Sequence, residues 1–214
     1  MNQTLIRKMV TEAIGTFALV FTVVCTVVQK QDLAALAIGA SLMVAVFAGA
    51  HISGAHYNPA VTLAVFLRGR LPATEVIPYW IAQFIGGSIA SGLALYVTNA
   101  DINSPSAYSG RAAGSAFTAE VIVTFALAYV VLNVATSKSH PNNNFYGLAI
   151  GFTVFVGAVA VGGISGGMFN PAVALGASIA GLTAWGNAWI YLVACFGGAA
   201  LAALTFRFLN PDDK

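Results

Sequence analysis

One segment of the chain occurs twice, and this duplication restricts the folds that the chain can adopt. Residues 51–61, HISGAHYNPAV, return as residues 163–173, GISGGMFNPAV, 112 positions later. Each copy contains Asn-Pro-Ala, in which a good N-cap residue precedes a proline suited to the first helical position. A short apolar run follows, over residues 61–67 in the first copy and over residues 173–175, before Gly176, in the second. Both copies therefore predict the start of a short helix.

Neither short helix can cross a bilayer, which takes about 20 apolar residues. The composition nevertheless indicates a membrane protein, because 58% of the residues are hydrophobic and only 7% are charged, against roughly 25% charged in soluble domains. The long apolar runs favour helices over the alternating segments of a membrane β-barrel. Two duplicated half-helices in such a chain indicate re-entrant segments that meet at the bilayer midplane. The residues predicted to form the motifs at this junction are Asn58, Pro59, Ala60, Asn170, Pro171 and Ala172.

Several other functional classes find no support in the sequence. A net charge of +2 without a basic cluster gives no indication of a nucleic-acid partner. No nucleophile–base set, phosphate loop or cluster of metal ligands is recognisable, so we expect neither an enzyme nor a cofactor. Cys25 and Cys195 lie in apolar runs and are expected to be free packing residues. His51 and His56 lack a third metal ligand nearby and are predicted to brace the first re-entrant loop.

The order of the apolar segments predicts an all-α membrane protein with six transmembrane helices plus two re-entrant half-helices. The six long segments cover residues 9–28, 34–52, 77–98, 115–136, 145–162 and 187–209. We expect residues 1–214 to form a single transmembrane domain built from two repeats. Repeat 1 covers about residues 1–98, a polar linker that should lie outside covers about residues 99–114, and repeat 2 covers about residues 115–209.

Lysine and arginine residues predict the orientation, because cytoplasmic loops carry an excess of them. With the N-terminus in the cytoplasm, the residues that fall inside are Arg7, Lys8, Arg68, Arg70, Lys138, Arg207 and Lys214, and those outside are Lys30 and Arg111. Each half has three spans, so the two halves enter the membrane from opposite sides and form an inverted repeat. We expect a multi-pass protein of the cell (inner) membrane with both termini cytoplasmic.

Taken together, these motifs resemble those of the aquaporin or major intrinsic protein family. The shared features are two Asn-Pro-Ala motifs, six spans, a Glu in the first and fourth spans, and His-x-Ser-Gly-x-His before the first motif. The resemblance covers nearly the whole chain. It implies an aquaporin-like right-handed bundle with one pore per subunit and assembly as a homotetramer. It also implies a passive channel for water and small neutral solutes in a lipid bilayer.

Four polar residues of the apolar segments carry the expected mechanism. Asn58 and Asn170 should present their amides to the pore, where two helix N-termini, each with roughly half a positive charge, repel protons and cations. Glu12 and Glu120 are acidic residues deep in apolar spans, where carboxylates are costly and usually functional. They could be proton relays or the cation site of a coupled transporter. The resemblance implies instead that they accept hydrogen bonds from the re-entrant loops.

The resemblance also places an outer selectivity constriction of four side chains in this family. By the family's spacing these are Ile38, Ala158, Gly167 and Val173. Val173 stands where the family almost always has Arg, and Ala174 stands where glycerol-type members usually have Asp. The constriction should therefore be wide and apolar. It should pass water and larger neutral solutes such as urea, ammonia, glycerol, hydrogen peroxide or metalloid hydroxides, or else dewet and conduct poorly.

Two further classes of function remain open at this point. A coupled secondary transporter also uses inverted repeats and broken helices, although the sequence has few charges at the midplane besides the two Glu residues. A structural membrane protein without useful conduction is the other alternative. The short termini and the lack of an extended adhesive loop speak against it.

Overall fold

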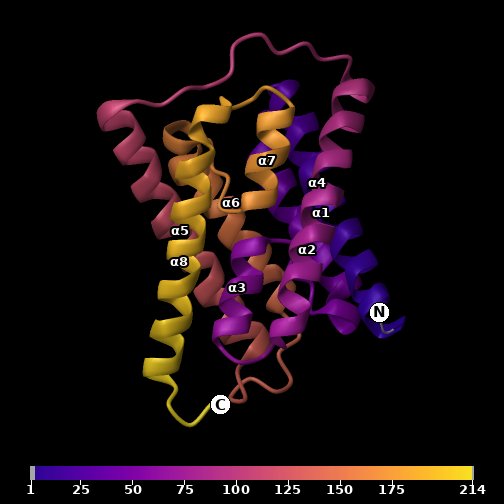
Figure 1. Ribbon diagram of the computed structural model, residues 1–214, viewed down its shortest axis with the longest axis vertical. Helices are drawn as coiled ribbons and strands as arrows, with labels where there is room; N and C mark the ends of the chain where they lie inside the picture. The colour runs from indigo at the N-terminus through magenta and orange to yellow at the C-terminus, as the bar shows by residue number, and fades with distance from the viewer. Residues whose placement is uncertain (1–2, 214) are drawn as a thin grey trace.

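The computed structural model describes residues 3–213, which form a helical bundle of two similar halves (Figure 1). The long helices are α1 (Gln3–Val28), α2 (Ala34–Ser53), α4 (Ala73–Thr98), α5 (Gly110–Thr136), α6 (Tyr146–Ser165) and α8 (Ala188–Leu209). The short ones are α3 (Pro59–Leu67), α7 (Pro171–Ile179) and the 3-10 turn η1 (Trp185–Asn187). Six of these helical segments are long and apolar enough to cross a membrane. The predicted all-α class with six spans and two half-helices is confirmed.

Two segments differ in length from the outline that the sequence suggests. The linker, expected at about residues 99–114, is shorter, because α5 already begins at Gly110. The second half-helix continues past Gly176, which follows the short apolar run, and ends at Ile179. A Cβ at Gly176 would come within 2.5 Å of Val20 Cγ1, and the Ser91 hydroxyl donates to the Gly176 carbonyl at 2.7 Å. Glycine here allows close packing without ending the helix.

The packing of the helices repeats between the halves. In the first half α1 packs against α2 and α4, and in the second half α5 packs in the same way against α6 and α8. Helices α2 and α6 cross each other, with Gly39 against Gly151, two residues that occupy equivalent places in the repeats. A Cβ on Gly39 would lie 2.7 Å from the Gly151 carbonyl oxygen. Because repeat partners touch here, the axis that relates the halves passes through this crossing.

The outer surface of the bundle is apolar, as a helix that faces lipid requires. One face of α4 exposes a stripe of large side chains with a spacing of four residues. These residues, each exposed by 45% or more, are Ile77, Ile81, Ile85, Ile89 and Leu93. Figure 1 shows α3 and α7 between the long helices, with α3 in the lower half of the view and α7 in the upper half. The two half-helices therefore approach the middle of the bundle from opposite ends.

Candidate functional site

The N-termini of the two half-helices are joined through their asparagines. Asn58 Oδ1 accepts from the backbone N–H of Ala60 at 2.8 Å, and Asn170 Oδ1 accepts from that of Ala172 at 2.9 Å. Each amide nitrogen then donates across the junction, Asn58 Nδ2 to Phe169 O at 2.9 Å and Asn170 Nδ2 to Tyr57 O at 2.8 Å. Each asparagine thus caps its own helix and fixes the loop of the other half.

These hydrogen bonds leave one amide hydrogen on each asparagine. The side-chain NH2 has two hydrogens, and the contact across the junction uses one of them. Both asparagines are 3% exposed, and both line the same cavity. The cavity wall therefore carries two N–H donors at the place where two helix N-termini meet.

Glu12 holds the first re-entrant loop with both carboxylate oxygens. Oε1 accepts from the Ser53 hydroxyl at 2.7 Å and from the His56 N–H at 2.9 Å. Oε2 accepts from the Tyr57 N–H at 2.7 Å and from Gln83 Nε2 at 2.8 Å. Tyr57 has a φ of 49°, a left-handed conformation that non-glycine residues adopt rarely. The hydrogen bond from its N–H to the carboxylate helps to hold this conformation.

Glu120 makes the equivalent contacts with the second loop. Its oxygens accept from the Ser165 hydroxyl at 2.7 Å, the Met168 N–H at 2.9 Å and the Phe169 N–H at 2.7 Å. Cys195 Sγ lies 3.7 Å from Glu120 Oε2, in the place that Gln83 Nε2 occupies beside Glu12 in the first half. Both carboxylates are fully buried and surrounded by donors from the loops. This geometry is that of structural acceptors, the role implied by the family resemblance.

The two histidines of the first loop differ in their environments. His56 is 7% exposed, its Nδ1 lies 3.1 Å from the Thr62 hydroxyl, and its ring packs against that of Tyr79. His51 lies on the exposed face of the last turn of α2. Within residues 3–213 its ring makes no hydrogen bond to the loop, because this face of the helix points away from it. Of the two histidines predicted to brace the loop, only His56 therefore makes contacts that fit this role.

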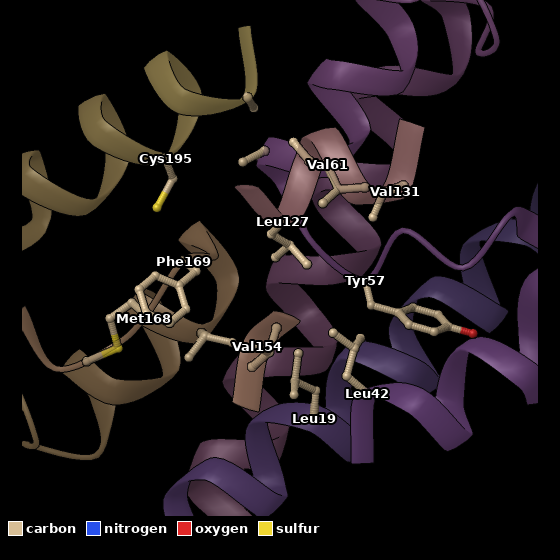
Figure 2. Close-up of a cluster of buried hydrophobic side chains, with 14 of the residues drawn as sticks. Leu19, Leu42, Tyr57, Val61, Leu127, Val131, Val154, Met168, Phe169 and Cys195 are labelled. Atoms are coloured by element: carbon tan, nitrogen blue, oxygen red, sulfur yellow. The ribbon is translucent and has the colours of Figure 1, made fainter. Parts of the chain in front are cut away.

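A cavity of about 560 Å³ lies between the half-helices and one end of the bundle. The four residues predicted to form the constriction, Ile38, Ala158, Gly167 and Val173, are all among the residues that line it. Most of the remaining cavity wall is also apolar. Figure 2 shows Leu19, Leu42, Val61, Leu127 and Val154 gathered from five helices, whereas the ring of Tyr57 points away from this group. Apart from the asparagines and His56, the polar side chains that line the cavity belong to the linker, which is predicted to lie on the outer side of the membrane.

A second cavity of about 530 Å³ opens toward the other end of the bundle. His56 and Val131 line both cavities, so the two spaces adjoin at these side chains. The rim of the second cavity is charged and includes Lys8, Arg70 and Lys138. The structure therefore provides two adjoining spaces on either side of the asparagine junction. Lys214, which the sequence also assigns to this side, lies outside the described residues.

A buried ion pair ties the C-terminal segment to this charged end. The fully buried guanidinium of Arg68 contacts Asp213 Oδ1 at 2.6 Å and the Thr136 hydroxyl at 3.0 Å. Asp213 Oδ2 accepts from the Ser137 hydroxyl at 3.0 Å and from the Lys138 N–H at 2.9 Å. Burial opposes ionisation of this carboxyl. The hydrogen bonds from Lys138, Arg68 and Ser137 outweigh that effect and hold the pKa of Asp213 well below its usual range.

Comparison with known proteins places this geometry in context. The family described as Major intrinsic protein matches residues 1–206. The chain is 38% identical to the glycerol uptake facilitator protein-like 6 of Lactiplantibacillus plantarum, over 97% of this chain and 100% of the relative. It is 37% identical to the probable aquaporin TIP1-2 of Oryza sativa, over 85% of this chain and 74% of the relative.

A solved structure has the same fold. The aquaglyceroporin from Plasmodium falciparum superposes with a TM-score of 0.78, covering 94% of this chain and 95% of that one. The two sequences are 21% identical, so the match bears on the fold alone.

Proposed function

The chain belongs to the major intrinsic protein family, and we propose that its two adjoining cavities form one passive channel through the junction of the half-helices. Members of this family are channels for water and small solutes and not enzymes. The chain is accordingly a multi-pass integral membrane protein of the aquaporin and aquaglyceroporin class. In this proposal residues 1–214 act as a single channel domain, and the path passes His56 and Val131.

The observation that carries the proposal is the pair of amide hydrogens at the junction. Asn58 and Asn170 each have one N–H left over and face the cavity. A water or hydroxyl oxygen that passes can accept a hydrogen bond there, which replaces one that it had in bulk water. Apart from His56 and the linker residues Ser104, Ser106 and Tyr108, the side chains of this wall are apolar, so a solute has few other partners and no tight binding site to delay it.

The same junction supports the exclusion of ions. Each half-helix has the positive end of its dipole, roughly half an elementary charge, at its N-terminus. A hydronium or metal cation would meet both ends inside an apolar wall, where electrostatic repulsion is screened little. Glu12 and Glu120 line neither cavity, and their oxygens accept hydrogen bonds from the loops, so they offer no ligand to a cation on this path. Neutral molecules meet no such barrier.

The four constriction residues support a broad range of solutes. Ile38, Ala158, Gly167 and Val173 offer no charge, no ring and no side-chain donor. We propose that water passes together with one or more of urea, ammonia, glycerol, hydrogen peroxide and metalloid hydroxides. The relative named as a glycerol uptake facilitator-like protein supports solutes larger than water.

Assembly and orientation are parts of the same proposal. The family resemblance supports a homotetramer with one channel per subunit. The basic residues at the second cavity support a cytoplasmic position for that end, by the excess of Lys and Arg on cytoplasmic sides. Figure 1 shows α1 beginning and α8 ending in the lower half of the view, which supports a cytoplasmic location for both termini. We propose the cell (inner) membrane as the site of action.

Stopped-flow light scattering of proteoliposomes tests this function. An impermeant osmolyte measures water efflux from the shrinkage rate, and urea and glycerol gradients then measure solute influx. We expect shrinkage and recovery that are both faster than in empty vesicles. Rates equal to those of empty vesicles would overturn the proposal. Saturating flux coupled to an ion gradient would indicate a secondary transporter instead.

A further inference from the structure

The linker between α4 and α5 forms part of the wall of the larger cavity. It crosses the end of the bundle where α7 ends and α8 begins (Figure 1). Ser106 N donates to Leu182 O at 3.1 Å, and Ala184 N donates to Ser106 O at 2.8 Å. Asn187 adds two further bonds, from its Nδ2 to Ser106 O at 2.8 Å and from Tyr108 N to its Oδ1 at 3.2 Å. The linker is therefore held in an extended conformation across the cavity mouth.

This conformation determines which linker side chains face the cavity. The residues that line it are Ile102, Ser104, Ser106 and Tyr108. Their spacing of two is that of an extended chain, in which successive side chains point to opposite faces. Three of the four carry a hydroxyl group. The linker thus adds polar groups beside a predicted constriction that has none of its own.

The hydroxyl of Tyr108 reaches the second re-entrant loop. A Cβ atom on Gly166 would lie 3.7 Å from the Tyr108 hydroxyl oxygen and 3.5 Å from that of Tyr191. Gly166 directly precedes Gly167, which is one of the four constriction residues. The Tyr108 hydroxyl is therefore next to the narrow part of the proposed path.

The hydrogen bond of the neighbouring phenol leaves the Tyr108 oxygen available as an acceptor. Tyr191 donates its single hydrogen to Ser165 O at 2.8 Å, so it has none left to donate to the Tyr108 oxygen. Tyr108 then keeps lone pairs that are free to accept from a solute. In the first half, Tyr79 makes the matching bond to Ser53 O at 2.7 Å. No linker residue of the described chain joins it there, so the additional acceptor belongs to the outer half alone.

We propose that Tyr108 is a specificity-determining residue, a hydrogen-bond acceptor that favours solutes with several N–H or O–H donors. This inference rests on the proposed channel function. A solute that enters the apolar constriction loses hydrogen bonds to water, and a bond to Tyr108 replaces one of them. The net effect of one neutral hydrogen bond corresponds to a difference of about fivefold in rate.

Tyr108→Phe tests this proposal by removing the hydroxyl and keeping the ring. Urea and acetamide are suitable probes, because acetamide has a methyl group in place of one NH2 of urea and is of similar size. We expect urea influx into proteoliposomes to fall about fivefold and acetamide influx to fall less, so that the ratio of the two rates decreases. Tyr96→Phe is the matched control. Tyr96 is 83% exposed on α4 and should leave the ratio unchanged.

Asn187→Ala provides a second variant that keeps the phenol. It removes the bonds to Ser106 O and Tyr108 N, so it should displace the linker and lower the same ratio. An unchanged ratio in Tyr108→Phe would overturn the inference, as would equal losses of water, urea and acetamide flux, which indicate a purely structural role. If Tyr108→Phe does not fold, the ratio in Asn187→Ala decides. Wild-type influx no faster than in empty vesicles would overturn the channel function and this inference with it.

Discussion

Glu12→Gln isolates the contribution of one buried carboxylate to the first re-entrant loop. The two oxygens accept four hydrogen bonds, from Ser53, His56, Tyr57 and Gln83. Gln keeps one oxygen and has an NH2 group in place of the other. The two groups that donate to the replaced oxygen would then face another donor. The Ser53 hydroxyl can rotate, and the Gln83 amide can turn to present its oxygen, which has no partner in the described residues. A backbone N–H has no such freedom.

One backbone donor is therefore left unpaired in either orientation of the new amide, at about 1–3 kcal/mol. In a chain of about 200 residues each 1 kcal/mol lowers the Tm by about 2–4 °C, so Glu12→Gln should lower it by about 2–12 °C. Glu12→Ala leaves all four donors unpaired and should lower the Tm further or prevent folding. Thermal unfolding of the purified protein in detergent, followed by circular dichroism, measures the difference.

Glu75→Gln is the matched control for this measurement. Glu75 pairs with Lys8 at 2.8 Å in a partly exposed position, where an ion pair contributes about 0–1 kcal/mol. The Tm of the Glu75→Gln protein should therefore differ less from that of the wild type than the Tm of the Glu12→Gln protein does. A Glu12→Gln protein as stable as this control would refute the argument that the carboxylate fixes the loop. Retained stability with altered proton flux would support a proton relay instead.

Three other outcomes are expected from the same structure. Val173→Arg should narrow the constriction and reduce urea and glycerol influx while some water flux remains, and unchanged influx of both solutes would show that the constriction lies elsewhere. Asn58→Asp should admit cations by placing a negative charge at the helix N-termini, which a potassium flux assay on folded protein can detect or exclude. The lowered pKa of Asp213 stabilises the fold above the unfolded value of about 3.9 and less as the pH falls below it. The Tm difference between wild type and Asp213→Asn should therefore be constant near neutral pH and shrink in acid; a difference that does not depend on pH would contradict this assignment.

The parts of the site that depend on local chemistry could be predicted from the sequence. The caps at Asn58 and Asn170 follow from their own neighbours, since an asparagine before a proline favours a helix start wherever it occurs. Glu12 and Glu120 follow from the cost of a carboxylate in an apolar span, which requires donors close by. The family resemblance then indicated that the re-entrant loops supply those donors.

The parts that depend on tertiary contacts could not be predicted in this way. Gly176 interrupts the apolar run of the second half-helix, and only the structure shows that it packs against Val20 and Ser91 within α7. The linker reads as an outer loop because it is polar, and its pairing with the turn after α7 places Tyr108 in the cavity wall. His51 reads as a partner of the loop by proximity in sequence, yet the last turn of α2 directs it outward.

The most direct test of the central claim compares neutral and charged solutes in the same proteoliposomes. Urea influx is followed by light scattering, and proton and potassium fluxes are followed by an internal pH dye and by a potential-sensitive dye. The account predicts urea influx faster than in empty vesicles with proton and potassium fluxes that equal those of empty vesicles. Ion fluxes that rise together with urea influx would contradict it, because the two helix N-termini at Asn58 and Asn170 would then not form a barrier to cations.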